Sequence, residues 1–263
     1  MQMKFALGAL ALFVAAATAQ AQTDNPYSQV RIVEGHMLAD GRYLAGVEIA
    51  LAQGWKTYWR EPGEGGIPPF FDWSTSTGVA ISAVEWPVPE IFETYGLRSL
   101  GYRDRVLFPM IFDVLGDASE AELRLSLDYG LCSDVCIPAT ATATLPVDLD
   151  ARRNEAALAA ARHQGNGPQS VEVACDVVPA AGAFRLDALA RLDGMADART
   201  VAVFETPDPD LWIGTAERVE QGDGQLFSAP MDWFGDGAFA LSRETINTTF
   251  VNSGEWVVTV EGC

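Results

Sequence analysis

Basic residues are scarce in this sequence. It has 17 Lys and Arg against 36 Asp and Glu, which gives a formal net charge of −19 at pH 7. An acidic surface of this kind repels phosphate backbones and anionic membranes. The charge balance therefore excludes nucleic acid as a partner.

Long apolar runs and the motifs of common enzyme chemistry are also missing. After the first residues, no segment approaches the roughly 18 consecutive apolar residues that a membrane-spanning helix needs, so we expect no membrane span. The sequence contains no HExxH motif, no Gly-rich phosphate loop and no Ser/His/Asp set, and its only histidines are His36 and His163. Hydrolase and nucleotide chemistry have no support, and nothing indicates a bound cofactor.

Residues 1–21 have the features of a secretory signal peptide. Lys4 precedes an apolar run from Phe5 to about Ala17, and small residues lead up to Ala21. Cleavage there removes one lysine and no acidic residue, which leaves 16 basic and 36 acidic residues and a net charge of −20. We expect an exported protein, in which cysteines tend to be oxidised and a reduced thiol pair needs a dedicated source of electrons.

The segment from Ser28 to Val147 has the pattern of an all-β sandwich. Short apolar runs, several of them alternating with polar residues, are separated by Gly, Pro and Asp. No helical pattern of 10 to 15 residues lies between them, which argues against a thioredoxin or Rossmann arrangement. We predict a first domain over residues 22–149.

One helix is expected, over Asp148–Gln164, with an Asp as N-cap and many alanines. The following "GNGPQS" has the composition of a linker. We therefore assign residues 150–169 to a helix and linker. Residues 170–263 return to the β pattern and predict a second, smaller sandwich.

Cys132 and Cys136 are predicted to face each other across a β-hairpin. In "AELRLSLDYGLC" the residues Leu123 to Leu131 of odd number share an apolar face, and Cys132 falls on the polar face; the same alternation in "CIPATATATL" places Cys136 on the polar face. A three-residue connection is a common hairpin length, and opposed Cα atoms lie about 4.5 to 5.5 Å apart, within the range of a disulfide. A β-bulge at Gly130 would invert this alternation.

A disulfide at this position is expected to be reactive rather than purely structural. A bridge that closes three residues removes little entropy from the unfolded chain, and a solvent-facing bridge has the character of a labile one. A merely structural hairpin disulfide is the alternative. We expect the neighbouring Asp128 and Asp134 to disfavour the thiolate form of either cysteine.

Three segments resemble the periplasmic N-terminal region of the DsbD and ScsB thiol:disulfide interchange proteins. They are "GWKTYWREPGEGGIPP", "YGLRSLGYRDRVLFP" and "YGLCSDVCIP". The resemblance implies an immunoglobulin-like domain in the periplasm with Cys132 and Cys136 as its redox pair. It also implies that electrons come from a membrane-embedded thiol reductase on a separate chain and pass to thioredoxin-like or disulfide-containing periplasmic proteins, with Cys136 as the cysteine that joins the partner.

The same resemblance identifies a cap loop near the cysteines, "EIFETYG". It assigns cap and tuning roles to Phe92, Glu93 and Tyr95, and a tuning role to Asp128. The DsbD type has Asp-Glu-Phe-Tyr-Gly where this chain has Phe92 to Gly96, so we expect the aromatic cap to be displaced or lost and one acidic residue to be missing. The ScsB-like group carries a second sandwich, which agrees with the pattern of residues 165–263.

Cys175 and Cys263 lie near the two ends of the predicted second domain. A disulfide between them closes a long loop and stabilises the fold by about 3 to 5 kcal/mol in the chain-entropy account. Cys175 is in phase with Val171 and Val173, whereas Cys263 is in phase with Thr259 and Glu261, so the alternation alone is mixed. We predict a structural disulfide.

Two other functions stay open. Thiolates select Cu(I), and a CxxxC followed by Pro resembles the Sco-type copper assembly proteins, so a periplasmic copper-binding or copper-tolerance protein could use Cys132 and Cys136 as ligands. With only two histidines the ligand supply is poor. A structural adhesin or assembly module is the third possibility. An aromatic-rich zone that includes Trp55, Tyr58 and Trp59 is interpreted either as core or as a docking surface.

Overall fold

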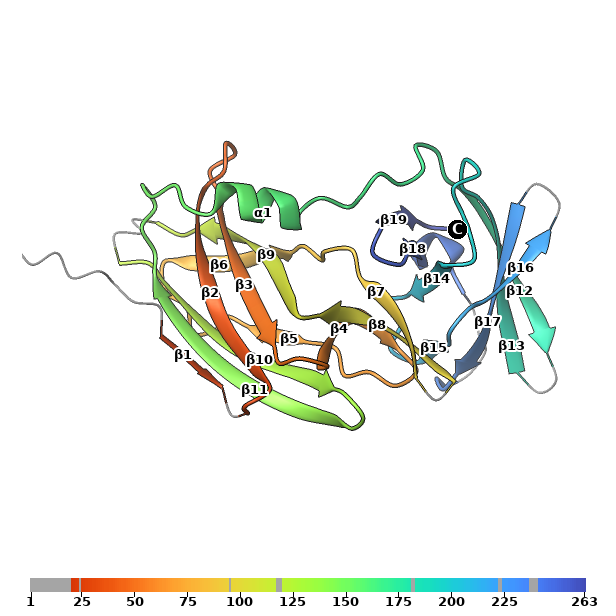
Figure 1. Ribbon diagram of the computed structural model, residues 1–263. Coiled ribbons are helices and arrows are strands. Elements are labelled where there is room, and N and C mark those ends of the chain that lie inside the picture. The colour runs from red at the N-terminus through yellow and green to blue at the C-terminus, as the bar shows by residue number, and fades with distance from the viewer. Residues whose placement is uncertain are drawn as a thin grey trace, which may run out of the picture.

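The computed structural model describes residues 20–23, 25–94, 96–116, 120–180, 183–221, 224–236 and 241–263. The predicted all-β architecture is confirmed: strands in four sheets account for most of the described chain (Figure 1). The described helices include none with the length and apolar character to cross a membrane. Of the predicted signal peptide, residues 1–19 lie outside the described residues.

The first sandwich consists of a seven-stranded and a four-stranded sheet. The larger sheet has the order β1-β11-β10-β4-β8-β7, with β5 also paired to β10: β1 Gln20–Thr23, β11 Cys136–Pro146, β10 Glu122–Cys132, β4 Lys56–Gly63, β8 Leu97–Arg103, β7 Glu90–Thr94 and β5 Phe70–Asp72. The smaller sheet has the order β2-β3-β9-β6: β2 Ser28–Met37, β3 Tyr43–Leu51, β9 Arg105–Val114 and β6 Val79–Val84.

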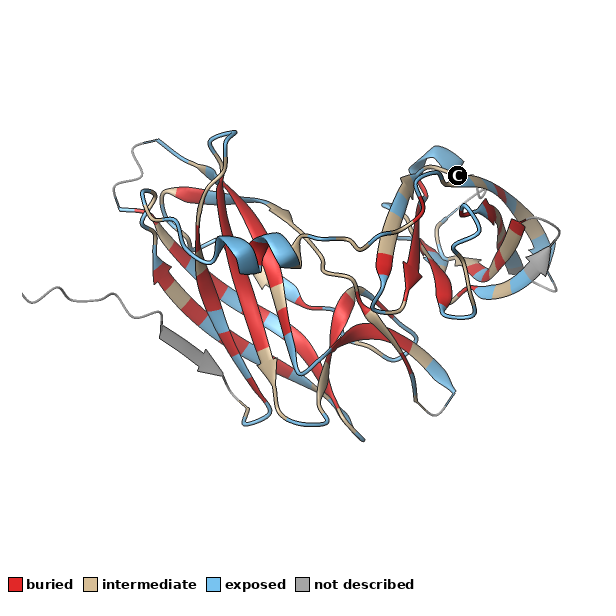
Figure 2. Ribbon diagram, turned by 45° about the horizontal axis from the view of Figure 1, so that its top comes forward, coloured by how far each residue is buried: buried red, intermediate tan, exposed pale blue. Residues whose placement is uncertain are grey.

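The core of this sandwich follows the predicted alternation. All five odd-numbered residues from Leu123 to Leu131 in β10 are buried, whereas Arg124, Ser126 and Asp128 between them are exposed (Figure 2). They pack in one cluster with residues of the facing sheet, among them Tyr43, Val47, Phe108 and Phe112. Each large apolar side chain buried in this way contributes about 1.5 to 3 kcal/mol, so the register of β10 is strongly fixed.

The helix is shorter than predicted. It runs only over α1, Glu155–Ala161, and its N-cap is Asn154 in the left-handed conformation, not an Asp. The backbone N–H of Arg153 donates to the carbonyl of Gly35, and the Asn154 amide donates to the carbonyl of Glu34, so the preceding residues are held against β2 and cannot wind into the helix. Leu158 is fully buried, with Leu44 and Ile111, and fixes α1 on the outer face of the four-stranded sheet.

The second sandwich also consists of two sheets. One has the order β12-β13-β17-β15 with β16 paired to β17, and the other has the order β14-β18-β19. The elements are β12 Glu172–Ala180, β13 Ala183–Arg191, β14 Thr200–Glu205, β15 Leu211–Ile213, β16 Glu217–Gln221, β17 Gly224–Trp233, the 3₁₀ helix Arg243–Thr245, β18 Asn247–Asn252 and β19 Trp256–Glu261. The structure joins Cys175 of β12 to Cys263 by a disulfide, and Cys175 is buried. The boundaries 22–149, 150–169 and 170–263 stay a prediction.

The second sandwich lies against the β7–β8 end of the first (Figure 1). The backbone N–H of Ile91 in β7 donates to the hydroxyl of Ser253 at 2.8 Å, and the N–H of Gly254 donates to the carbonyl of Pro89 at 2.9 Å. Val201 and Val251, from β14 and β18, pack into the core cluster of the first sandwich. The contact is therefore both apolar and hydrogen-bonded, and it reaches β7, the strand formed by the first five residues of the predicted cap loop.

Candidate thiol–disulfide site

Cys132 ends β10 and Cys136 begins β11. The two strands pair without a register shift from Glu122–Pro146 to Cys132–Cys136, so no β-bulge interrupts the hairpin. The cysteines are direct partners in the ladder, with Cα atoms 4.0 Å apart, and their sulfurs are bonded. The geometry expected from the alternation and the three-residue connection is thus present.

The two cysteines differ in exposure. Cys136 is exposed, but Cys132 keeps only 4% of its surface accessible, so the expectation that both lie on a solvent-facing surface is wrong for Cys132. The alternation itself is correct, yet the face it assigns to Cys132 is covered at this end of β10. Lys56 of β4 is the ladder partner of Cys132, and a loop folds over Gly130.

Gly130 lets that loop lie close to the sheet. A Cβ at this position would be 2.8 Å from the Cβ of Ile67 and 2.8 Å from a ring carbon of Tyr58. Real side chains do not reach such distances, so another residue here would push the loop outward. The hydroxyl of Thr57 adds a hydrogen bond of 2.8 Å to the carbonyl of Gly130.

Three side chains of β4 share one face of the strand. Lys56, Tyr58 and Arg60 alternate with Thr57 and Trp59, as the two-residue period of a strand requires, and Tyr58 is itself fully buried. Tyr58 places its hydroxyl 3.1 Å from the sulfur of Cys136. Nothing in the sequence indicated this contact, since 78 residues separate the two positions.

A pocket of about 280 Å³ lies over Cys132. Its lining includes Lys56, Phe92, Thr94, Arg103 and Cys132. The ammonium of Lys56 is 4.9 Å and the guanidinium carbon of Arg103 4.5 Å from the centre of the Phe92 ring, both within cation–π range. Two cations and an aromatic ring therefore stand beside the buried cysteine.

Lys56 is the only lysine in the sequence after Lys4. Its ammonium donates to the hydroxyl of Thr94 at 3.2 Å. Burial lowers the pKa of Lys56, and the positive charge of Arg103 lowers it further. The side chain is thus partly dehydrated and directed at the segment that covers Cys132.

The residues assigned to the cap loop are only partly brought together. Phe92 is buried beside the pocket, whereas Glu93 is exposed, lines the pocket and lies 3.9 Å from Arg98. Tyr95 lies outside the described residues. Asp128 is exposed four residues before Cys132 on the same strand, which places it about 13 Å from the disulfide at the usual rise per residue. The resemblance in sequence leads us to expect that the aromatic cap is displaced or lost. In the structure the ring of Phe92 is buried and lines the pocket at Cys132.

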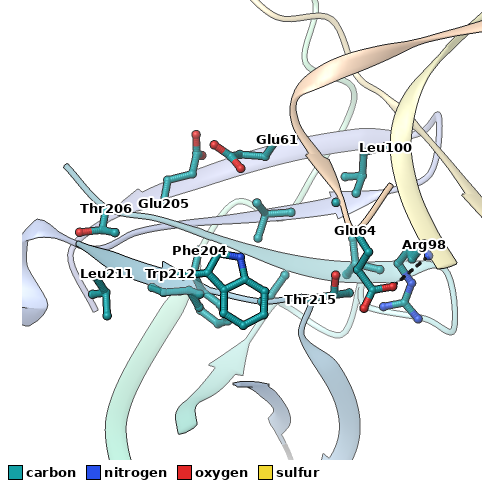
Figure 3. Close-up of a pocket in the computed structure, with 16 residues that line it drawn as sticks. Glu61, Glu64, Arg98, Leu100, Phe204, Glu205, Thr206, Leu211, Trp212 and Thr215 are labelled. Atoms are coloured by element: carbon teal, nitrogen blue, oxygen red, sulfur yellow. Dashed lines mark hydrogen bonds between the residues drawn. The ribbon is translucent and has the colours of Figure 1, made fainter. Parts of the chain in front are cut away.

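A second pocket, of about 250 Å³, lies between the two sandwiches (Figure 3). Glu61 and Arg98 line it from the first sandwich, and Phe204, Glu205 and Trp212 from the second. Burial, together with the nearby carboxylate of Glu205, raises the pKa of Glu61 to about 7. The sequence did not predict this pocket, which none of the cysteines lines.

The comparisons with known proteins agree with this site. The family described as "Thiol:disulfide interchange protein DsbD, N-terminal" matches residues 28–148, which include both cysteines of the hairpin. Residues 28–148 form a DsbD N-terminal domain. The resemblance seen in the sequence is thereby confirmed, and the domain carries a disulfide-forming cysteine pair of the thiol:disulfide interchange type.

The fold extends this likeness to the second sandwich. The crystal structure of the N-terminal periplasmic domain of ScsB from Proteus mirabilis superposes with a TM-score of 0.66 at 24% sequence identity, and the match covers 91% of this chain and 96% of that one. At this identity the match shows the fold, which is the predicted pair of immunoglobulin-like sandwiches. A search of curated proteins gave no match.

The described residues contain no group of three or more His, Cys, Asp or Glu side chains arranged to hold a metal ion. Cys132 and Cys136 therefore have no third ligand of these types beside them in the part of the chain that is described.

Proposed function

We propose that this protein is a periplasmic thiol:disulfide interchange protein that relays electrons through Cys132 and Cys136. The electrons come from a membrane-embedded thiol reductase and pass to thioredoxin-like or other disulfide-containing proteins of the periplasm. The observation that carries the proposal is the pair itself: a disulfide in a DsbD N-terminal domain, with one cysteine exposed and the other covered.

The exposure assigns different roles to the two sulfurs. A thiolate of the donor attacks the accessible sulfur of Cys136, the Cys132–Cys136 bond breaks, and Cys132 leaves as a thiolate. A second donor thiolate then attacks the donor sulfur of the mixed disulfide. It releases Cys136 as a thiolate and leaves the donor with a disulfide. Two electrons have moved to the pair, and the two thiol protons of the donor pass through solvent to the two cysteines.

Delivery to a substrate is the reverse sequence. The Cys136 thiolate attacks the substrate disulfide, one substrate thiolate leaves, and the Cys132 thiolate then attacks Cys136 and releases the second. Lys56 and Arg103 line the pocket at Cys132, so their positive charges stabilise the Cys132 thiolate. They favour the reduction step in which Cys132 leaves, and they raise the fraction of Cys132 that is thiolate and ready to attack Cys136 during delivery. The cover over Cys132 protects that thiolate from reaction with other molecules.

Localisation in the periplasm rests on two independent observations. The first residues predict a signal peptide. The structural relative is the N-terminal periplasmic domain of ScsB. The net charge of −20 that is expected after cleavage also favours other proteins over nucleic acid as binding partners.

Trapping of mixed disulfides tests the proposal. Oxidised thioredoxin-like protein is mixed with the Cys132→Ala variant and, separately, with the Cys136→Ala variant, and adducts are counted on a non-reducing gel and by mass spectrometry. We expect a covalent adduct through Cys136 and little or none through Cys132. Tight Cu(I) binding without adducts would support the copper function in its place. If neither adducts nor Cu(I) binding are found, a structural module remains as the explanation.

A further inference from the structure

The hydroxyl of Tyr58 is placed to act on the outer sulfur. Its oxygen lies 3.1 Å from the sulfur of Cys136 and 3.3 Å from the carbonyl oxygen of Gly65. A disulfide sulfur carries no proton, so the hydroxyl is the only possible donor of the pair. We infer that Tyr58 donates a hydrogen bond to the Cys136 thiolate that forms when the disulfide opens, and so sets the reactivity of this cysteine. The inference rests on the proposed function and deepens it.

The surroundings of Tyr58 keep the hydroxyl protonated and in place. Burial raises the pKa of Tyr58, so its proton stays on the oxygen throughout the neutral range. The ring is enclosed by two glycines, since a Cβ at Gly66 or at Gly130 would lie within 2.9 Å of ring carbons. The loop that passes over the ring therefore limits its movement away from Cys136.

The redox state changes how strongly the hydroxyl is bound. A disulfide sulfur is a weak acceptor, and the carbonyl of Gly65 competes for the same proton. A thiolate is charged, and hydrogen bonds to charged acceptors are roughly twice as strong as neutral ones. The hydroxyl thus stabilises the reduced form of Cys136 more than the oxidised form.

Tyr58 neither gains nor loses a proton or an electron in the thiol–disulfide exchange. The Cys136 thiol loses its proton to solvent, not to Tyr58, and the thiolate attacks the substrate disulfide to form one S–S bond as another breaks. The leaving substrate thiolate takes a proton from solvent. Tyr58 alters only the fraction of Cys136 that is thiolate and the ease with which Cys136 leaves.

Alkylation of a single cysteine measures this effect without any partner. In the Cys132→Ser variant Cys136 is free, and its rate of reaction with iodoacetamide is followed from pH 5 to pH 10. Adding Tyr58→Phe keeps the ring and removes the hydroxyl. We expect the midpoint pH of the rate profile to rise by about 1 unit, because a hydrogen bond to a charged group is worth roughly a factor of ten in its ionisation. The rate at pH 7 then falls by only about threefold, since nucleophilicity rises as the thiolate becomes more basic.

Tyr129→Phe is the matched control. Its hydroxyl lies 2.6 Å from the hydroxyl of Ser28, and its side chain is on the buried face of the same hairpin. We expect this variant to leave the midpoint unchanged. An unchanged midpoint in Tyr58→Phe, with a folded protein, would overturn the inference, and so would an equal shift in the control.

A second measurement covers the case in which Tyr58→Phe does not fold. Incorporation of 3-fluorotyrosine makes every tyrosine hydroxyl a stronger donor while burial keeps the Tyr58 hydroxyl protonated at neutral pH, and we expect the midpoint for Cys136 to fall; a rise or no change would contradict the role of Tyr58. Because neither measurement uses a partner, the absence of mixed disulfides would defeat only the proposed function, and an unchanged midpoint would defeat only this inference.

Discussion

Arg60 of the first sandwich holds Glu205 of the second through two hydrogen bonds of 2.8 Å each. The same guanidinium donates to Thr249 of β18 at 3.2 Å and stacks on the ring of Trp59. Both charged side chains are largely shielded from solvent, with 25% and 21% of their surface exposed. This pair therefore connects the central strand of the redox domain to the second sandwich.

Loss of the Arg60–Glu205 pair is expected to destabilise the protein. In Arg60→Ala the carboxylate of Glu205 loses its partner while it stays partly buried, at a cost of about 1 to 3 kcal/mol. Chemical denaturation measures the change. Arg42→Ala removes an exposed pair with Asp40 and should cost no more than about 0.5 kcal/mol. Equal effects of the two substitutions would contradict the importance of the pair between sandwiches.

Glu61 is expected to make stability depend on pH. Its pKa in the folded protein is about 7, against an ordinary value of 4.5. The folded state then binds a proton more tightly than the unfolded state, so the contribution of Glu61 to stability is greatest below pH 4.5 and is lost as pH rises to about 7. Glu61→Gln replaces the carboxyl by a neutral group that resembles its protonated form, so the variant should not lose this stabilisation as pH rises.

Unfolding free energies of the wild-type protein and Glu61→Gln at pH 5 and pH 8 test this sign. Between pH 5 and pH 8 the unfolding free energy of Glu61→Gln should rise by about 1 kcal/mol relative to that of the wild type. This is less than the full pKa shift of Glu61 implies, because Glu61 keeps more than a third of its surface exposed. A gain on lowering the pH would show that the sign is wrong.

The second sandwich is expected to restrain the segment that covers Cys132. Ser253→Ala leaves the N–H of Ile91 in β7 without its acceptor, and the loss of one hydrogen bond of about 1 kcal/mol should make local opening about fivefold more frequent. The rate of alkylation of Cys132 in a Cys136→Ala background reports this opening. Thr206→Ala is the control, because it removes a hydroxyl that accepts a hydrogen bond from the backbone N–H of Asp208 in the second sandwich, away from β7 and β10. If Cys132 were alkylated as slowly in Ser253→Ala as in the parent, the idea that the second sandwich restrains β7 would be contradicted.

The disulfide between Cys175 and Cys263 is expected to stabilise the fold and leave the redox pair unaffected. It closes a loop of 88 residues, so replacing both cysteines by alanine should cost about 3 to 5 kcal/mol. The rate of iodoacetamide reaction at Cys136, in the Cys132→Ser background, should stay the same. A changed rate would indicate that the second disulfide takes part in the chemistry.

The sequence alone was sufficient for the hairpin because its information is local. Alternation in β10 and β11 fixes which residues face the core, and a three-residue connection fixes the register, so Cys132 had to oppose Cys136. The same reasoning failed for the burial of Cys132, since the cover over it comes from β4, from the β7 region and from a loop that follows β4. No local pattern records that these segments meet.

Tyr58 and the start of α1 illustrate the same limit, because both depend on contacts that are distant in sequence. Tyr58 reaches Cys136 over 78 residues, although its spacing from Lys56 does predict that both lie on one face of a strand. The start of α1 was misplaced because helix propensity favours the residues after Asp148, whereas hydrogen bonds to the carbonyls of residues 34 and 35 hold the backbone before Asn154 in another conformation.

Direct transfer of electrons tests the central claim. The reduced protein is mixed with an oxidised thioredoxin-like periplasmic protein, and free thiols on both are counted by alkylation and mass spectrometry. We predict that Cys132 and Cys136 become oxidised as the partner gains two thiols, while Cys175 and Cys263 stay bonded. Retention of both thiols on Cys132 and Cys136, with no thiols gained by any partner tested, would contradict a redox relay.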